Sequence, residues 1–268
     1  MKHNNIKELS IQVNLNGLSF CILNRTSNTI EYLNYFPFEV KLNPFDALNR
    51  LKTELSTNTI FSDEFRDVTI IHQNELSSLV PKALFDENNK ADYLKFNAKI
   101  LKTDYLTHDD VVSNDSCNVY VPYVNFNNYI FETFGEFVFK HSSTLLIDTV
   151  LQQNKTNEDP QVVVNVNSNF IEVLVVENQK LQLFNTFEYT TKEDFIYYIL
   201  FVYEQLQLDV ETTKIQVLGS IDHGDDLYAI LYTYIRHVEI IPSQFNYKFA
   251  EGINTEHLHH HYLILNSF

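Results

Sequence analysis

Apolar residues along the chain follow two spacings, every second residue in short runs and every third or fourth residue in longer ones. The first spacing predicts strands, and the second predicts helices that bury one face. In the first half, strands are predicted over residues 8–15, 18–24, 29–38, 68–72 and 118–124. Helices are predicted from Pro44 onward, over residues 127–137 and over residues 143–153. Asn43 before Pro44 is typical of a helix start, because asparagine caps helix N-termini and proline favours the first helical position.

The second half repeats this order more compactly. Strands are predicted over residues 161–167, 170–177, 180–188, 214–218 and 238–241. Helices are predicted over residues 192–208 and 225–234, with a last helix after Lys248. The polar segment 154–160 ends in proline and is typical of a junction between domains. We therefore predict a first unit over residues 1–155 and a second over residues 156–268.

The two units share a direct repeat. Residues 11–38 align without a gap on residues 162–189. The identical pairs include Val13/Val164, Asn14/Asn165, Asn16/Asn167, Leu23/Leu174, Asn34/Asn185 and Phe36/Phe187. A repeat of this length exceeds the period of a solenoid and indicates two halves of similar fold. The order βββαβαβα in each half predicts an α/β protein with two mixed sheets, each covered by helices.

Composition narrows the choice of partner. The chain has 268 residues, of which 44% are hydrophobic, and this is enough to build sizeable cores. Its net charge of −16 disfavours nucleic acid and anionic membrane surfaces, which both attract basic groups. No run approaches the ~20 apolar residues of a membrane span, so we expect no membrane insertion. No pattern in the sequence specifies an oligomeric state.

The cysteines and the first residues bear on the compartment. Cys21 and Cys117 each lie in an apolar, strand-like run, which predicts buried free thiols and no disulfide framework. The first ten residues lack the apolar segment of a secretory signal peptide. We therefore expect a cytoplasmic protein.

Four segments carry a resemblance to known proteins. They are LSSLVPKALF (76–85), NVYVPYVNFNNYIFETFG (118–135), FEYTTKEDFIYYILFVYEQL (187–206) and HLHHHYLILN (257–266). With these segments the chain resembles a Bacteroidota family of unknown function that has an actin-like ATPase fold. More distantly, the doubled βββαβαβα unit resembles the actin-like ATPase superfamily, which includes the bacterial proteins FtsA and PilM. The resemblance implies two ribonuclease H-like lobes with a cleft between two hairpin tips.

The resemblance implies that nucleotide phosphates would bind at those hairpin tips, so the residues at the tips are compared with the superfamily's loops. Its ATPases hold phosphates, metal and water between two loops that read Asp-x-Gly. The matching positions here read Asn14-Leu15-Asn16-Gly17 and Asn165-Val166-Asn167-Ser168. An amide supplies no charge to Mg²⁺ or to its water ligands. We interpret Asn14 and Asn165 as residues that pin their turns by local hydrogen bonds, and we expect no cofactor.

A third loop of the superfamily carries a glycine pair near adenosine, and its counterpart here is Gly219-Ser220. The candidate cofactor-binding residues of these degenerate loops are Asn14, Asn16, Gly17, Asn165, Asn167, Ser168 and Gly219. We expect the four asparagines to lie close together at the inter-lobe junction, beside a cleft that is narrowed or filled.

The histidines 257 and 259–261 suggest a metal site, because His257 and His261 would share one face of a helix. The segment contains no HExxH pattern and no carboxylate at a matching interval beyond Glu256. We therefore interpret these histidines as packing or surface residues and predict no metal. No GxSxG, Walker-type, GxGxxG or CxxC motif is present, so the sequence predicts no catalytic residues.

Two hypotheses about function remain. The first is a non-catalytic actin-like protein, a pseudo-ATPase that binds or scaffolds a protein partner through an exposed sheet edge or an aromatic groove. The second is a divergent ATPase or phosphotransferase that binds ATP between the lobes and recruits Asp222, Asp225 or Glu193 as catalytic groups. The aromatic side chains of helix 192–208 are interpreted mostly as helix core.

Overall fold

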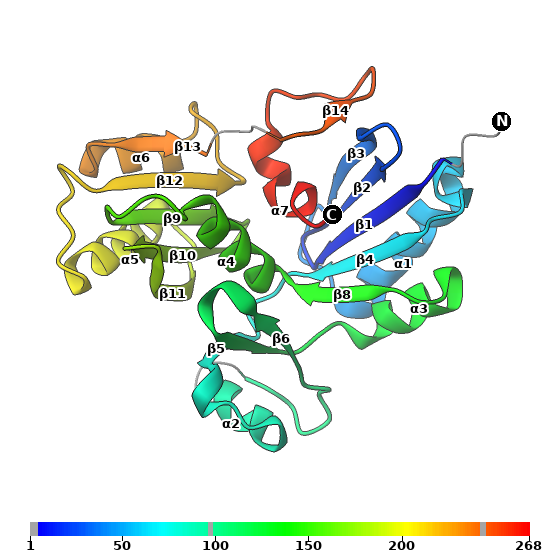
Figure 1. The fold of residues 1–268 in the computed structure, drawn as a ribbon, viewed down its shortest axis with the longest axis horizontal. Coiled ribbons are helices and arrows are strands. Elements are labelled where there is room, and N and C mark those ends of the chain that lie inside the picture. Colours follow the sequence, from blue (N-terminus) through cyan, green and yellow to red (C-terminus); the bar gives the residue numbers. More distant parts are fainter. Residues whose placement is uncertain (1–4, 96–98, 242–244) are drawn as a thin grey trace.

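The structure is a computed structural model that describes residues 5–95, 99–241 and 245–268. It consists of two lobes, each built on an open sheet, with a smaller sheet projecting from one side (Figure 1). No helix in these ranges is both long and apolar enough to cross a membrane.

The first lobe contains a six-stranded sheet of order β14-β3-β2-β1-β4-β8. Its strands are β1 (Lys7–Asn14), β2 (Gly17–Asn24), β3 (Thr29–Pro37), β4 (Asp67–His72), β8 (Val138–His141) and β14 (Lys248–Phe249). The pairs β1–β2 and β2–β3 are antiparallel, whereas β1–β4 and β4–β8 are parallel. Helices α1 (Pro44–Thr57) and α3 (Val124–Phe134) bury apolar side chains in one core cluster with this sheet.

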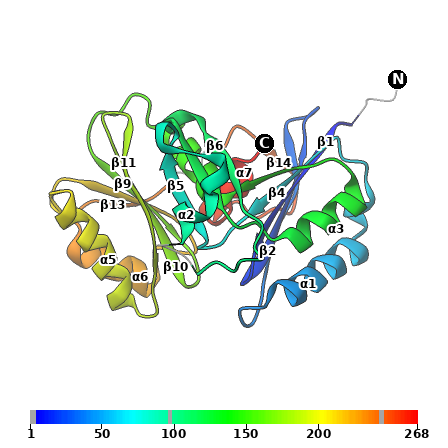
Figure 2. The same ribbon diagram turned by 90° about the horizontal axis from the view of Figure 1, so that it is seen from below.

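The second lobe repeats this strand order as β11-β10-β9-β12-β13. Its strands are β9 (Gln161–Val166), β10 (Phe170–Glu177), β11 (Lys180–Glu188), β12 (Lys214–Gly219) and β13 (Val238–Ile240). Helices α5 (Lys192–Gln205) and α6 (Asp226–Tyr234) cover one face of the sheet (Figure 2). The strands and helices of this lobe agree with the sequence predictions to within a few residues at their ends.

A third, small sheet was not predicted. It has the order β5-β7-β6 and consists of β5 (Ser77–Pro81), β6 (Thr107–Val111) and β7 (Ser116–Tyr120), accompanied by α2 (Lys90–Leu94). The strand predicted over residues 118–124 was assigned to the first lobe's main sheet, and this assignment is wrong, because β7 pairs with β5 and β6 in a separate sheet. The main sheet instead ends in the four-residue strand β8, which lies between two predicted helices.

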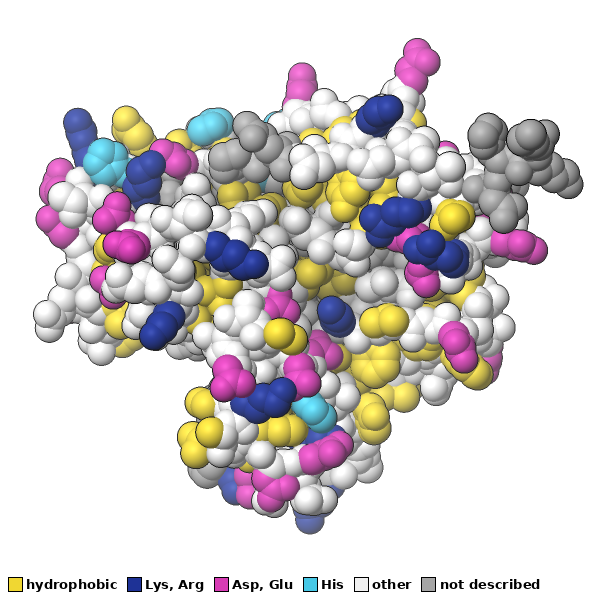
Figure 3. All heavy atoms as spheres, in the orientation of Figure 1, with side chains coloured by type: hydrophobic (Ala, Val, Ile, Leu, Met, Phe, Trp, Pro, Cys, Tyr) yellow, Lys and Arg dark blue, Asp and Glu magenta, His cyan; other side chains and the backbone are white. Residues whose placement is uncertain are grey.

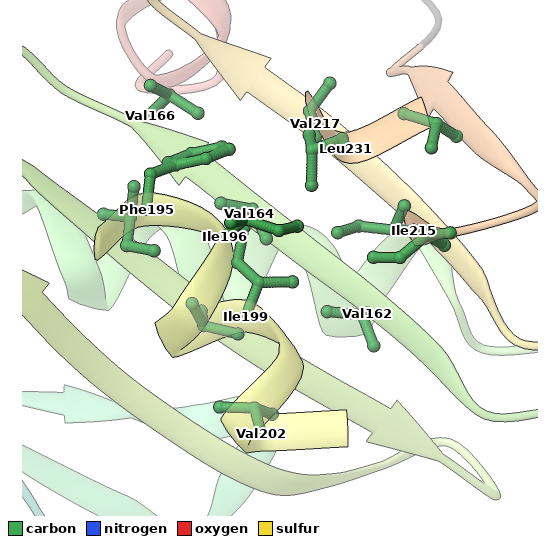
Figure 4. Packing of buried hydrophobic residues seen from close by; sticks show 14 of the residues in the cluster. Val162, Val164, Val166, Phe195, Ile196, Ile199, Val202, Ile215, Val217 and Leu231 are labelled. Atoms are coloured by element: carbon green, nitrogen blue, oxygen red, sulfur yellow. The ribbon is translucent and has the colours of Figure 1, made fainter. Parts of the chain in front are cut away.

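Local sequence explains where the long helices begin. The side chain of Asn43 accepts hydrogen bonds from the backbone N–H groups of Phe45 and Asp46, and Pro44 follows it, as predicted. Helix α5 begins with a capping box, in which Thr191 and Asp194 each accept a backbone N–H of the other. Figure 4 shows the inner face of α5 packed against β9 and β12, with Phe195 and Ile199 facing the valines of these strands.

Two helices, α4 (Ser142–Gln153) and α7 (Tyr262–Leu265), lie between the sheets of the two lobes (Figures 1 and 2). Leu146, Ile147 and Val150 of α4 pack in one cluster with Val163 and Leu174 of the second sheet. The C-terminal segment also returns to the first lobe, because β14 pairs with β3. The boundary between residues 155 and 156 stays a prediction.

Short 3₁₀ helices complete the chain at Thr59–Ser62, Lys82–Leu84, Glu87–Asn89, Val112–Asn114 and Leu258–His261. Cys21 and Cys117 are buried free thiols, as the sequence predicted. Acidic side chains are scattered over the face in Figure 3 and are interspersed with lysine and arginine.

Two buried histidines lie at neighbouring positions of β4 and β8. His72 and His141 are paired in the sheet and are fully buried. The Nδ1 atom of His141 accepts the backbone N–H of Ser143 at 3.2 Å and so caps α4. Burial lowers the pKa of His72 to about 4 and that of His141, which also lies near His72, to about 3. Both rings are therefore neutral in the folded protein at pH 7.

These depressed pKa values predict acid destabilisation. The unfolded chain takes up protons below pH 6.5 and the folded chain does not, so stability is present above that pH and is lost as pH falls. Protonation of each histidine in the unfolded chain should lower the free energy of unfolding by about 2 kcal/mol between pH 6.5 and 5. Urea unfolding across this range measures the slope.

Burial also lowers the pKa of His261 to about 4, so three histidines contribute to the measured decline. The variant His141→Asn should remove roughly a third of it, because asparagine keeps a capping acceptor but does not titrate. His237→Asn is the matched control, since it makes the same substitution at an exposed position. An unchanged slope in His141→Asn would contradict the assignment.

Candidate functional site

A cavity of about 320 Å³ lies between the two lobes. All seven candidate residues line it, namely Asn14, Asn16, Gly17, Asn165, Asn167, Ser168 and Gly219. The prediction that the two hairpin tips meet at the inter-lobe junction is confirmed. The cleft is not filled, although residues 259–263 of the C-terminal segment form one wall of it.

Side-chain amides connect the two lobes across this junction. Asn16 of the first tip donates from Nδ2 to Oδ1 of Asn169 in the second tip at 3.1 Å. Gln73, which follows β4, donates from Nε2 to Oδ1 of Asn167 at 2.5 Å and accepts a hydrogen bond from Gln12 at 2.7 Å. The lobes therefore meet through neutral hydrogen bonds at the place where the superfamily resemblance implies phosphates and metal.

At the first tip, Asn14 pins the turn as predicted. Its Oδ1 accepts the backbone N–H of Asn16 at 2.7 Å, and Asn14 pairs with Gly17 across the hairpin. The Tyr35 ring packs over Gly17, and a Cβ added at position 17 would lie 2.5 Å from that ring. Glycine at this position therefore accommodates a neighbouring ring.

At the second tip, Asn165 has a different role from the one predicted. It is buried, and its Nδ2 donates at 2.7 Å to Oε2 of Glu172, its partner across the hairpin. Ser143 at the start of α4 donates to the other carboxylate oxygen, Oε1, at 2.6 Å. Burial raises the pKa of Glu172, and these donors lower it in part. The Asn165 amide thus stabilises a buried carboxyl group of its own lobe.

The third loop follows β12. Gly219 has a φ of +82°, and a Cβ there would overlap the carbonyl oxygen of Val166, so only glycine fits. Beyond it, Asp225 accepts the backbone N–H of Asp222 at 2.8 Å and holds the turn before α6. Asp222 and Asp225 both line the cavity, whereas Glu193 is exposed on α5 and is not among the lining residues.

Asp222 also faces three histidines of the C-terminal segment, which the sequence did not predict. Its Oδ1 lies 2.8 Å from Nδ1 of His257, and its Oδ2 lies 3.2 Å from Nε2 of His260. His259 is buried, with Nε2 3.2 Å from the same Oδ1 and 2.8 Å from the Ile221 carbonyl oxygen. The carboxylate that was missing from the histidine segment comes from a loop 35 residues away in the sequence from His257.

Known proteins place this architecture in a class. The chain is similar to a Bacteroides thetaiotaomicron VPI-5482 protein with an actin-like ATPase fold and unknown function. The two sequences are 22% identical, and the match covers 88% of this chain and 91% of that chain with a TM-score of 0.78. It is also similar to a chain of the PilM-PilN type IV pilus biogenesis complex, at 8% identity, with coverage of 97% and 95% and a TM-score of 0.64. The fold is therefore the actin-like ATPase fold, as expected.

The chain belongs to the family described as "Protein of unknown function (DUF3822)", whose model matches residues 1–238. No curated protein sequence matches the chain.

Because Asn165 donates to the buried Glu172, replacing asparagine by aspartate should destabilise the protein more at the second tip than at the first. Asn165→Asp replaces a donor by a second carboxyl group beside a buried one, which should lower the free energy of unfolding at pH 7 by about 3 kcal/mol. Two carboxyl groups that share a site have raised pKa values in the folded state, so the loss should shrink as pH falls toward 5. Urea unfolding at both pH values measures the effect.

Asn14→Asp is the matched control. Its new carboxylate still accepts the Asn16 N–H in a half-buried turn, so the change should stay below about 1 kcal/mol. Equal losses at the two tips would contradict the role assigned to Asn165.

Proposed function

We propose that this protein is a non-catalytic actin-like protein, a pseudo-ATPase that acts as a binding or scaffolding module. The observation that carries the proposal is the chemistry of the two tips. Each tip has asparagine where the superfamily resemblance implies a carboxylate, and both amides are engaged within the protein, Asn14 with its own turn and Asn165 with Glu172. Neither side chain supplies a negative charge to a metal ion.

The remaining carboxyl groups near the cavity are also engaged. Glu172 is buried behind Asn165, Asp225 holds a turn, and Asp222 faces the histidines. A general base or metal ligand for phosphoryl transfer must instead be free to reach water or Mg²⁺. These contacts support a scaffold more than an ATPase.

The alternative, a divergent ATPase or phosphotransferase, is favoured by one observation. The cavity of about 320 Å³ falls within the usual size range of small-molecule sites and is lined by both tips and Gly219. Asp222 and Asp225 are the carboxylates within its lining.

A scaffold also requires a surface for its partner. Helices α5 and α6 expose Tyr197, Phe201, Tyr232 and Tyr234 on the outside of the second lobe. Aromatic side chains are enriched where proteins bind each other. The similar PilM chain was solved in a complex with PilN, so an actin-like fold is compatible with a protein partner. We expect the protein to work in the cytoplasm.

Nucleotide titration tests the proposal. We expect no hydrolysis of Mg-ATP above the buffer rate and a dissociation constant weaker than roughly 1 mM, or about −4 kcal/mol, because the tips lack charge for the metal. Isothermal calorimetry and phosphate release measure the two quantities.

The control is Ser168→Trp, which places a large ring at an exposed position of the cavity wall without disturbing the core. Micromolar binding that this variant abolishes would overturn the proposal and favour the ATPase. Gly17→Val is less suitable, since its side chain collides with Tyr35 and changes the tip itself.

A further inference from the structure

Three histidines and one aspartate converge beside the inter-lobe cavity. One potential ligand atom from each of Asp222, His257, His259 and His260 can be chosen so that all four lie within 4.8 Å of one another. In a tetrahedral shell, two ligands that each lie about 2.0–2.1 Å from a zinc ion are about 3.4 Å apart. Side-chain movements of about 1 Å would therefore bring all four atoms to ligand distance.

We propose that these four residues bind a divalent transition-metal ion of the zinc type. Imidazole nitrogens with one carboxylate oxygen match the ligand preference of zinc, whereas calcium and magnesium prefer oxygen ligands alone. Four protein ligands complete a tetrahedral shell, so the site is structural and leaves no open position for chemistry.

The hydrogen bonds around Asp222 explain how the site exists without metal. Nδ1 of His257 and Nε2 of His260 lie against the two carboxylate oxygens at 2.8 and 3.2 Å, where imidazole N–H groups donate. When a metal ion binds, each neutral ring carries its proton on the other nitrogen, so that the nitrogen facing Asp222 is free to act as a ligand. His259 additionally gives up its hydrogen bond to the Ile221 carbonyl oxygen, so we expect it to contribute least to affinity.

The four proposed ligands come from two segments that are far apart in the sequence, so a metal ion would link these segments. Asp222 belongs to the loop after β12 in the second lobe, while the histidines immediately precede α7, whose residues pack between the lobes. A bound ion would therefore fix the C-terminal segment to the second lobe and hold one wall of the cavity.

Zinc and cobalt titrations test the site on the full chain produced without a polyhistidine tag. We expect one zinc ion per chain by calorimetry and a rise of several degrees in melting temperature, which a chelator reverses. Co²⁺ should give the intense visible absorption of four-coordinate cobalt with nitrogen and oxygen ligands. Weak absorption typical of six-coordinate cobalt, or a preference for Ca²⁺ or Mg²⁺, would overturn the proposal.

The variant His257→Ala/His260→Ala removes two exposed ligands and should weaken zinc binding by at least about tenfold. His223→Gln is the matched control, because His223 is exposed, directly follows Asp222 and is not one of the four. Equal zinc affinity in the double variant and the parent would overturn the proposal. Where the double variant does not fold, His257→Ala alone replaces it, since that side chain is 48% exposed.

Discussion

The arrangement of the lobes depends on a helix of four residues. All side chains of α7 are buried, and they divide between the lobes. Tyr262 and Leu263 pack with α4 and the second sheet, whereas Ile264 and Leu265 pack against the first sheet. Burial of each such side chain stabilises by about 1.5–3 kcal/mol, and Tyr262 also donates to Gln153 of α4 at 2.6 Å. Apolar contacts of α7 thus join the two lobes, in addition to the hydrogen bonds between the hairpin tips.

The buried carboxyl group of Glu172 is the second constraint, because a carboxyl group can remain buried only where donors surround it. Asn165 is one donor and Ser143 of α4 is another, so this group joins the second sheet to the helix between the lobes. An aspartate at position 165 would remove a donor and add a charge. The structure therefore gives the asparagine a role in packing that is incompatible with a metal-binding carboxylate at the same position.

The sequence predicted those parts of the fold whose signal is local. In the second lobe, β10 and β11 were predicted to the residue, since each is an apolar or alternating run bounded by turns. The small sheet was missed because β6 reads Thr-His-Asp-Asp-Val, a polar run stabilised only by its neighbours. Likewise, the tips could be aligned from the repeat, but the partners of Asn165 and Asp222 could not, because they come from other elements of the fold.

The C-terminal segment brings these constraints together at the cavity. In the actin-like superfamily the loop at Gly219 would approach adenosine, and bound phosphates would bridge the tips. Here residues 259–263 line the cavity together with Gly219, and His259 reaches the Ile221 carbonyl oxygen two residues further on. The amides of Asn16 and Asn169 bridge the tips directly. The two tips are thus bridged by hydrogen bonds between side chains of the chain itself, at the place where the superfamily resemblance implies phosphates.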